Sequence, residues 1–188
     1  MLINEKALLR AMKEKYKTSG YHVAVIKGEK QDKMFLTGGS WTVLTHVSTV
    51  PRKVLGYIAQ TVGDLPRPGQ AYRVRKDMTE LEELEFVTGL IDKAEDLFRE
   101  TPRWRIKPTE LTMGGNELWQ NCGTMEMVLM DPALTGIIGD SRTEVYMAGD
   151  LLSTEDTESV IYLARIRTAE ESEKYLEHLS KALWVAVT

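Results

Sequence analysis

The sequence has very little cysteine and no long apolar run. Cys122 is the single cysteine in 188 residues, which excludes an internal disulfide framework and a zinc site built from several cysteines. No stretch of about 18 apolar residues is present, so a transmembrane helix is excluded as well. The first residues, MLINEKALLRAMKEK, place charges inside their apolar stretch, unlike a signal peptide. We therefore expect a cytoplasmic protein that does not engage a membrane.

The common motifs of phosphate, nucleotide and metal sites are also missing. The chain contains no GxGxxG, no GxxxxGK[ST], no HExxH and no EF-hand loop. The histidines His22, His46 and His178 fall on separate predicted elements, without the spacing of a metal site. Cys122 would act as a nucleophile only if a histidine approached it in space. We assign no catalytic, cofactor-binding or metal-binding residue, and we expect no cofactor.

Charge is distributed unevenly along the chain, although the net charge is only -4. Residues 1–76 hold 14 basic and 5 acidic residues, whereas residues 77–188 hold 10 basic and 23 acidic residues. This pattern has two interpretations: a basic face that meets a polyanion, or two halves that neutralise each other. We therefore divide the chain into a basic α+β subdomain, 1–76, and an acidic α+β subdomain with a C-terminal helix, 77–188. One continuous domain is the alternative.

The candidate polyanion-binding residues come from three predicted elements. A helix over 4–18 turns its basic residues outward, a second helix after Pro51 begins with two more, and a strand over 71–76 carries two on one face. They are Lys6, Arg10, Lys13, Lys17, Arg52, Lys53, Arg73 and Arg75. A second basic and aromatic segment covers 102–107. Such strands either grip phosphates and stack on bases, or protect a sheet edge against aggregation.

Hydrophobic periodicity predicts the remaining elements. The strongest helical pattern covers 80–100, where Thr79 and Glu82 form a capping box. A short helix should begin at Pro132, and a last helix should follow Thr168. Strands are expected at 21–27, 34–37, 41–48, 71–76, 104–107, 110–113, 117–121, 125–130, 144–147 and 159–165.

An internal echo indicates that the two halves are similar. The segment LTGGSW is echoed by LTMGGNELW, so Gly38 and Gly114 are 76 residues apart, as are Gly63 and Gly139. We predict an α+β fold with two similar α-β-β-β-α-β subdomains, a largely antiparallel sheet and a C-terminal helix. Chance recurrence of glycine pairs in hairpin turns is the alternative.

The predicted unit resembles the half-domains of DNA sliding clamps. The resemblance rests on a helix, a β-hairpin, the segment VPRKVLGYIAQTVGDLP at 50–66 and the apolar strand ESVIYLARI at 158–166. It implies a clamp-like fold, and we draw no function from it. The chain departs from the family because clamp domains are longer and their DNA-facing helices are basic, whereas 80–100 is acidic. No binding residue is therefore transferred from the family.

Together these observations favour a non-catalytic binding or accessory module, in nucleic-acid metabolism or in a mobile genetic element. We expect a protein partner or self-association, with nucleic acid as a further candidate partner. The alternative is a small cytoplasmic enzyme without a recognisable motif.

Overall fold

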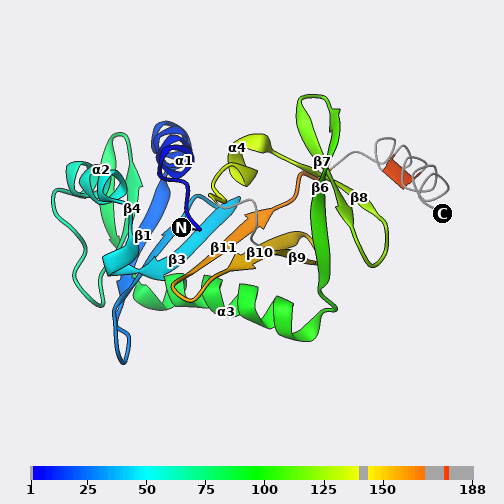
Figure 1. Cartoon of the computed structure of the whole chain (residues 1–188). Coiled ribbons are helices and arrows are strands. Elements are labelled where there is room, and N and C mark those ends of the chain that lie inside the picture. The colour runs from blue at the N-terminus through cyan, green and yellow to red at the C-terminus, as the bar shows by residue number, and fades with distance from the viewer. Residues whose placement is uncertain (1, 140–143, 168–175, 178–188) are drawn as a thin grey trace.

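The structure is a computed structural model that describes residues 2–139, 144–167, 176 and 177. Within these residues the chain forms helices on both faces of one large antiparallel sheet (Figure 1). This arrangement confirms the predicted α+β class. The predicted C-terminal helix falls mainly on 168–184, which lies almost wholly outside the described residues.

The helices and strands follow one another in a similar order in the two halves of the chain. The helices are α1 (Glu5–Lys17), α2 (Arg52–Val62), α3 (Leu84–Glu100) and α4 (Pro132–Thr135), with a 3-10 turn at Val47–Thr49. The strands are β1 (Tyr21–Ile26), β2 (Lys33–Thr37), β3 (Trp41–His46), β4 (Ala71–Arg75), β5 (Met78–Glu82), β6 (Trp104–Met113), β7 (Asn116–Asn121), β8 (Met127–Met130), β9 (Val145–Ala148), β10 (Leu151–Glu155) and β11 (Ser159–Ala164).

Strand order is the same in the two halves. The sheet runs β5-β4-β1-β2-β3-β11-β10-β9-β6-β7-β8. In each half the first strand pairs with the second and the fourth, the second with the third, and the fourth with the fifth. The second half has one more strand, β11, which pairs with β3 and joins the halves into a single sheet.

The two matched glycine pairs differ in whether they fall at equivalent positions. Gly38 lies in the turn between the second and third strands of its half, whereas Gly114 lies between β6 and β7, the first and second strands of the other. Hairpin turns need residues with positive φ, as Gly39 and Gly114 have, so such pairs recur without equivalence. Gly63 and Gly139, in contrast, each lie between the second helix and the fourth strand of their half. The similarity of the halves therefore rests mainly on strand order.

The start of the third helix differs from the prediction. Thr79 and Glu82 do not cap a helix, because Met78–Glu82 is strand β5 and α3 begins at Leu84. A two-residue turn folds β5 back onto β4, where all five residues pair. The Thr79 hydroxyl donates instead to the carbonyl of Thr61 at 3.1 Å. Ladder pairing therefore overrides the local capping pattern.

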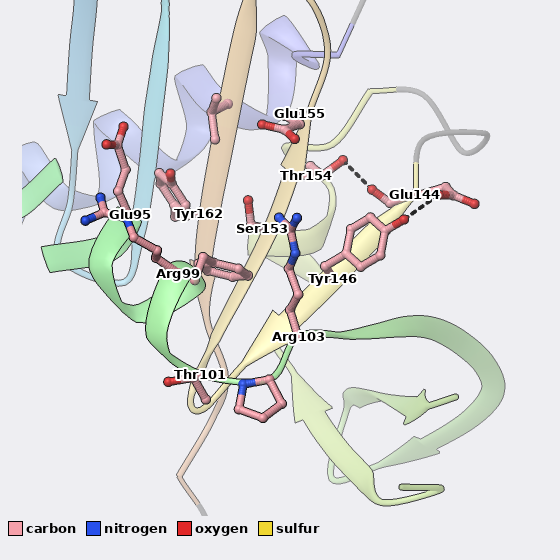
Figure 2. Close-up of a pocket in the computed structure, with 13 residues that line it drawn as sticks. Glu95, Arg99, Thr101, Arg103, Glu144, Tyr146, Ser153, Thr154, Glu155 and Tyr162 are labelled. Carbon is pink, nitrogen blue, oxygen red and sulfur yellow. Dashed lines mark hydrogen bonds between the residues drawn. The ribbon is translucent and has the colours of Figure 1, made fainter. Parts of the chain in front are cut away.

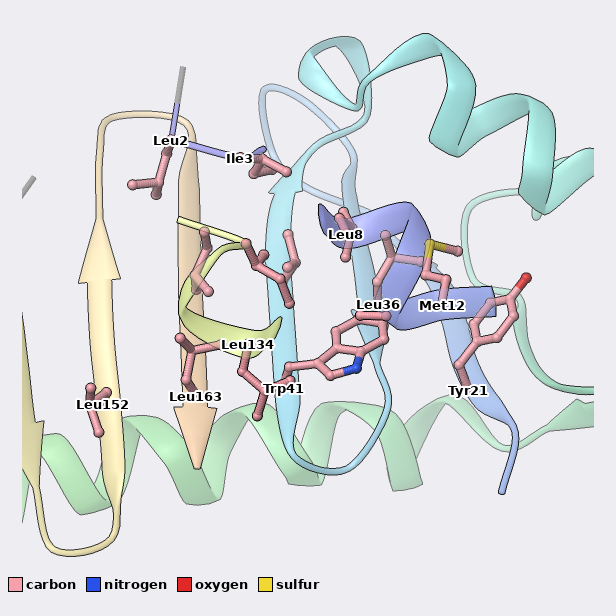
Figure 3. Close-up of a cluster of buried hydrophobic side chains, with 14 of the residues drawn as sticks. Leu2, Ile3, Leu8, Met12, Tyr21, Leu36, Trp41, Leu134, Leu152 and Leu163 are labelled. Carbon is pink, nitrogen blue, oxygen red and sulfur yellow. The ribbon is translucent and has the colours of Figure 1, made fainter. Parts of the chain in front are cut away.

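Helices cover the two faces of the sheet unequally. Helices α1, α2 and α4 lie on one face, called here the α1 face, and α3 crosses the other, the α3 face (Figure 1). The core on the α1 face includes Leu8 and Met12 of α1 packed with Tyr21 and Trp41 of the sheet (Figure 3). It also contains Leu152 and Leu163, so residues from both halves share it. On the α3 face, α3 packs against a smaller cluster in β1, β2 and β3.

Candidate polyanion-binding face

Helix α1 carries a row of exposed basic residues. The side chain of Asn4 caps its first turn by accepting from the backbone N–H groups of Lys6 (3.2 Å) and Ala7 (3.3 Å). Leu8, Ala11 and Met12 are buried on the sheet side. The helical period therefore leaves one basic side chain on the solvent side in each turn. These four exposed residues are Lys6, Arg10, Lys13 and Lys17.

Helix α2 lies beside α1 and extends this row. Its first two residues, Arg52 and Lys53, are both exposed. The ammonium group of Lys53 lies 3.4 Å from a carboxylate oxygen of Glu5, and the Lys53 backbone N–H donates to the same carboxylate at 3.3 Å. Lys13 Nζ lies 5.7 Å from the centre of the Tyr57 ring, within the range of a cation–π interaction. These contacts hold the two helix surfaces together.

Two of the eight predicted residues do not belong to this surface. Tyr72 and Val74 of β4 pack in the core under α1, and side chains alternate along a strand. Arg73 and Arg75 therefore point to the α3 face, where Arg75 lies 3.6 Å from Glu80. The sequence groups them with the basic residues of the two helices, but strand alternation places them on the other side of the sheet. We call the remaining six residues the cationic face: Lys6, Arg10, Lys13, Lys17, Arg52 and Lys53.

The acidic side chains of helix α3 do not cover the cationic face. Helix α3, which carries five acidic residues, crosses the opposite face of the sheet (Figure 1). Among the described residues, the one ion pair made by the cationic face joins Lys53 to Glu5, which belongs to α1 itself. Direct neutralisation of this face by α3 is therefore ruled out by the geometry.

A polar cleft of about 1020 Å³ lies on the α3 face (Figure 2). The C-terminal end of α3 forms one wall, and β9, β10 and β11 form the floor. The carboxylate of Glu144 accepts a hydrogen bond from the Tyr146 hydroxyl at 2.6 Å, and it forms an ion pair with Arg105 at 3.1 Å. The hydrogen bond to Glu144 raises the pKa of Tyr146. Burial, followed by Glu95 and Glu155, raises the pKa of Tyr162 to about 12.

The sequence did not predict this cleft, although the basic and aromatic segment 102–107 supplies part of its lining. The segment 102–107 was interpreted as a phosphate-binding strand or a protected edge. Arg103 lines the cleft and Arg105 pairs with Glu144, while β6 is an interior strand between β9 and β7. The edge interpretation is therefore wrong for this strand. Glu144 and Tyr146 carried no sequence signal of their own, because strand pairing assembles the cleft from distant segments.

Among the described residues, Cys122, His22 and His46 lie on or next to different strands of the sheet. Cys122 is exposed in the turn between β7 and β8, with its thiol 4.0 Å from the carbonyl of Gln120. His22 contacts the carboxylate of Glu82 and lies 5.9 Å from the Phe86 ring. His46 is half-buried at the end of β3, and His178 lies outside the described residues.

The described residues contain neither a cluster of metal ligands nor a helix that could span a membrane. In 2–139, 144–167, 176 and 177, no group of three or more His, Cys, Asp or Glu side chains is placed to hold a metal ion. Within the same residues, no helix is long and apolar enough to cross a membrane.

Comparison of the chain with protein-family models, curated proteins and solved structures finds no match. The resemblance to DNA sliding clamps therefore stays a prediction.

Proposed function

We propose that the protein is a non-catalytic binding module whose cationic face binds a polyanion, with nucleic acid as the preferred class. Its role would then be that of an accessory protein in nucleic-acid metabolism or in a mobile genetic element. The equal strand order of the two halves supports a further part of this proposal, that one α+β unit was duplicated to give a broad, continuous sheet.

One observation carries the proposal. Six exposed cations lie on neighbouring helices, and the acidic helix that could neutralise them crosses the other face of the sheet. Clustered Lys and Arg side chains gain free energy by releasing counterions from a phosphate backbone. The overall acidity of the chain does not oppose this contact, since charges beyond about 10 Å are largely screened at 0.1 M salt.

The test is charge reversal measured by fluorescence anisotropy. Fluorescein-labelled 20-nucleotide single-stranded DNA and the corresponding duplex would be titrated with protein at about 50 mM NaCl. Arg10→Glu with Lys13→Glu should weaken binding about tenfold or more, because both changes repel phosphate. The matched control, Lys30→Glu with Lys93→Glu, changes net charge equally at exposed positions outside the cationic face. It should change affinity about twofold at most.

Absence of binding by the unchanged protein to either DNA would remove the nucleic-acid proposal. Equal losses in the two double variants would contradict a local site, because they would show that net charge alone governs binding. Thermal melts of both variants check that the fold persists, and exposed charges contribute little to folding.

A further inference from the structure

The two edges of the sheet differ in how they are closed. At one end all four residues of β8 are buried, and the carbonyl of Leu129 accepts a hydrogen bond from the backbone N–H of Ile166 at 3.0 Å. At the other end β5 is the last strand, and among the described residues it pairs only with β4. Its first four residues are exposed and Glu82 is half-buried. Within the part of the chain that the structure describes, one edge is therefore covered and the other is open.

The backbone groups that face outward from β5 follow from the neighbouring ladder. The backbone N–H of Val25 in β1 donates to the carbonyl of Gln70 at 3.0 Å. Bonding direction alternates along a strand, so Tyr72 and Val74 of β4 bond toward β1. The odd-numbered residues of β4 then bond toward β5, through its residues 78, 80 and 82. Thr79 and Leu81 therefore direct their N–H and C=O groups away from the sheet.

This open edge is apolar as well as unpaired. Leu81 is 72% exposed and Met78 is 48% exposed. Edge strands usually limit such exposure by carrying a proline, a bulge or charged side chains, above all lysine. β5 has no proline, bulge or lysine, and its charged residues are Glu80 and Glu82. An exposed leucine next to unpaired backbone is the pattern of an edge that accepts another strand.

The negative charge around β5 indicates that a partner strand carries basic residues. Residues 77–85 contain five acidic residues and no basic one: Asp77, Glu80, Glu82, Glu83 and Glu85. On the α3 face of the ladder, Glu80 stands opposite Arg73 of β4 and lies 3.6 Å from Arg75. On the α1 face, Leu81 stands opposite Tyr72. The strand that already pairs with β5 is β4, in which apolar residues alternate with basic ones. A second partner of β5 is therefore expected to have the same alternation.

We infer that β5 is a docking edge for an extended segment of a partner protein in which apolar residues alternate with lysine or arginine. The segment adds a twelfth strand to the sheet by bonding to Thr79 and Leu81. Its basic side chains lie beside Glu80 and Glu82, and its apolar side chains cover Leu81. A second copy of this chain does not fit, because pairing β5 with itself brings acidic residues together across the ladder. This inference is independent of the proposed function, since it concerns backbone pairing at a sheet edge and a basic partner, whereas the proposed function concerns the cationic face and a polyanion.

The probe is a fluorescein-labelled peptide, GSAYRVRKGS, which carries the sequence of residues 71–76. Hydrogen exchange followed by NMR on the full chain locates its binding. The amides of Thr79 and Leu81 should exchange about tenfold more slowly with saturating peptide. The amides of 78, 80 and 82 already bond to β4 and should change little. A peptide with the same residues in the order AYVRRK keeps the charge, breaks the alternation and should give no protection.

A pair of variants separates backbone pairing from side-chain contact. Leu81→Pro removes an outward N–H together with the apolar side chain, whereas Leu81→Ala removes only the side chain. Proline is tolerated where the strand N–H faces solvent, and it should weaken peptide binding about tenfold more than alanine does. The exchange experiment on the unchanged chain remains decisive if the proline variant fails to fold.

Three results would overturn the inference. The first is absence of binding at about 1 mM peptide, a concentration that detects even a contact of about -4 kcal/mol. The second is binding that leaves the Thr79 and Leu81 amides unprotected. The third is protection of both amides without peptide in a concentration-dependent dimer, which would make a second copy the occupant.

Discussion

The side-chain oxygens of Thr45 and Ser159 lie 2.6 Å apart in the buried ladder between β3 and β11. The Thr45 hydroxyl also lies 2.8 Å from the hydroxyl of Thr49. This strand pair joins the two halves of the sheet. The hydroxyl contact therefore contributes to the stability of the junction between them.

Thr45→Val should lower the free energy of unfolding by about 1–3 kcal/mol, since it leaves the buried Ser159 hydroxyl without its partner. Ser159→Ala should lower it by less, about 0.5–1.5 kcal/mol, because the Thr45 hydroxyl keeps its contact with Thr49. The double variant should lose less than the sum of the two, because the interaction can be lost only once. Urea denaturation measures all three, with exposed Ser48→Ala as the control. Additive losses would contradict a direct contact.

Gly38 and Gly56 should respond in opposite ways to alanine. A Cβ on Gly38 would lie 2.5 Å from Nε1 of the buried Trp41 ring, whereas a Cβ on Gly56, within α2, meets nothing within 4 Å. Gly38→Ala should therefore destabilise the fold by about 1–3 kcal/mol, and Gly56→Ala should stabilise it by about 0.5–1 kcal/mol. Thermal melts compare them directly, and a destabilised Gly56→Ala variant would be inconsistent with an exposed helical site.

Tyr162 should make the fold sensitive to alkali. Its pKa is raised from 10.0 to about 12 in the folded chain by burial first and then by Glu95 and Glu155. Between these values the unfolded chain releases the proton while the folded chain keeps it, so stability falls as the pH rises through this window. Tyr162→Phe should reduce the loss measured by urea denaturation between pH 10 and 12. An unchanged pH dependence in this variant would contradict the raised pKa.

Cys122 should be chemically accessible and structurally dispensable. It is exposed in the turn after β7, so Cys122→Ala should change the free energy of unfolding by about 0.5 kcal/mol at most. In the folded protein the thiol should react with a chromogenic disulfide reagent as fast as it does in urea. Strong protection of the thiol under native conditions would contradict the exposed position.

The sequence predicted those parts of the fold that depend on local pattern. The helix over 4–18, the strands of the first half and the hairpin turn at Gly38 follow from periodicity and turn chemistry, and the structure contains all of them. Predictions failed where pairing between strands determines the secondary structure. Thr79 and Glu82 match a capping box, yet a ladder with β4 draws them into a strand.

The side of the sheet to which a side chain points was harder to predict than the type of element that carries it. The sequence showed that Arg73 and Arg75 share a side of a strand, but only the packing of Tyr72 and Val74 under α1 shows which side. The cleft beside Tyr146 is likewise built from segments that meet only through strand pairing. Local sequence carries no direct signal for such contacts.

The salt dependence of DNA binding tests the central claim most directly. Affinity for the labelled 20-nucleotide duplex would be measured from about 50 to 200 mM NaCl for the unchanged protein and for Arg10→Gln with Lys13→Gln. Each phosphate contact adds about 0.9 to the slope of log affinity against log salt. If both side chains contact phosphate, the slope of the double variant should be smaller by about 1.8. A double variant with the same slope and affinity as the unchanged protein would contradict the cationic face as the binding site.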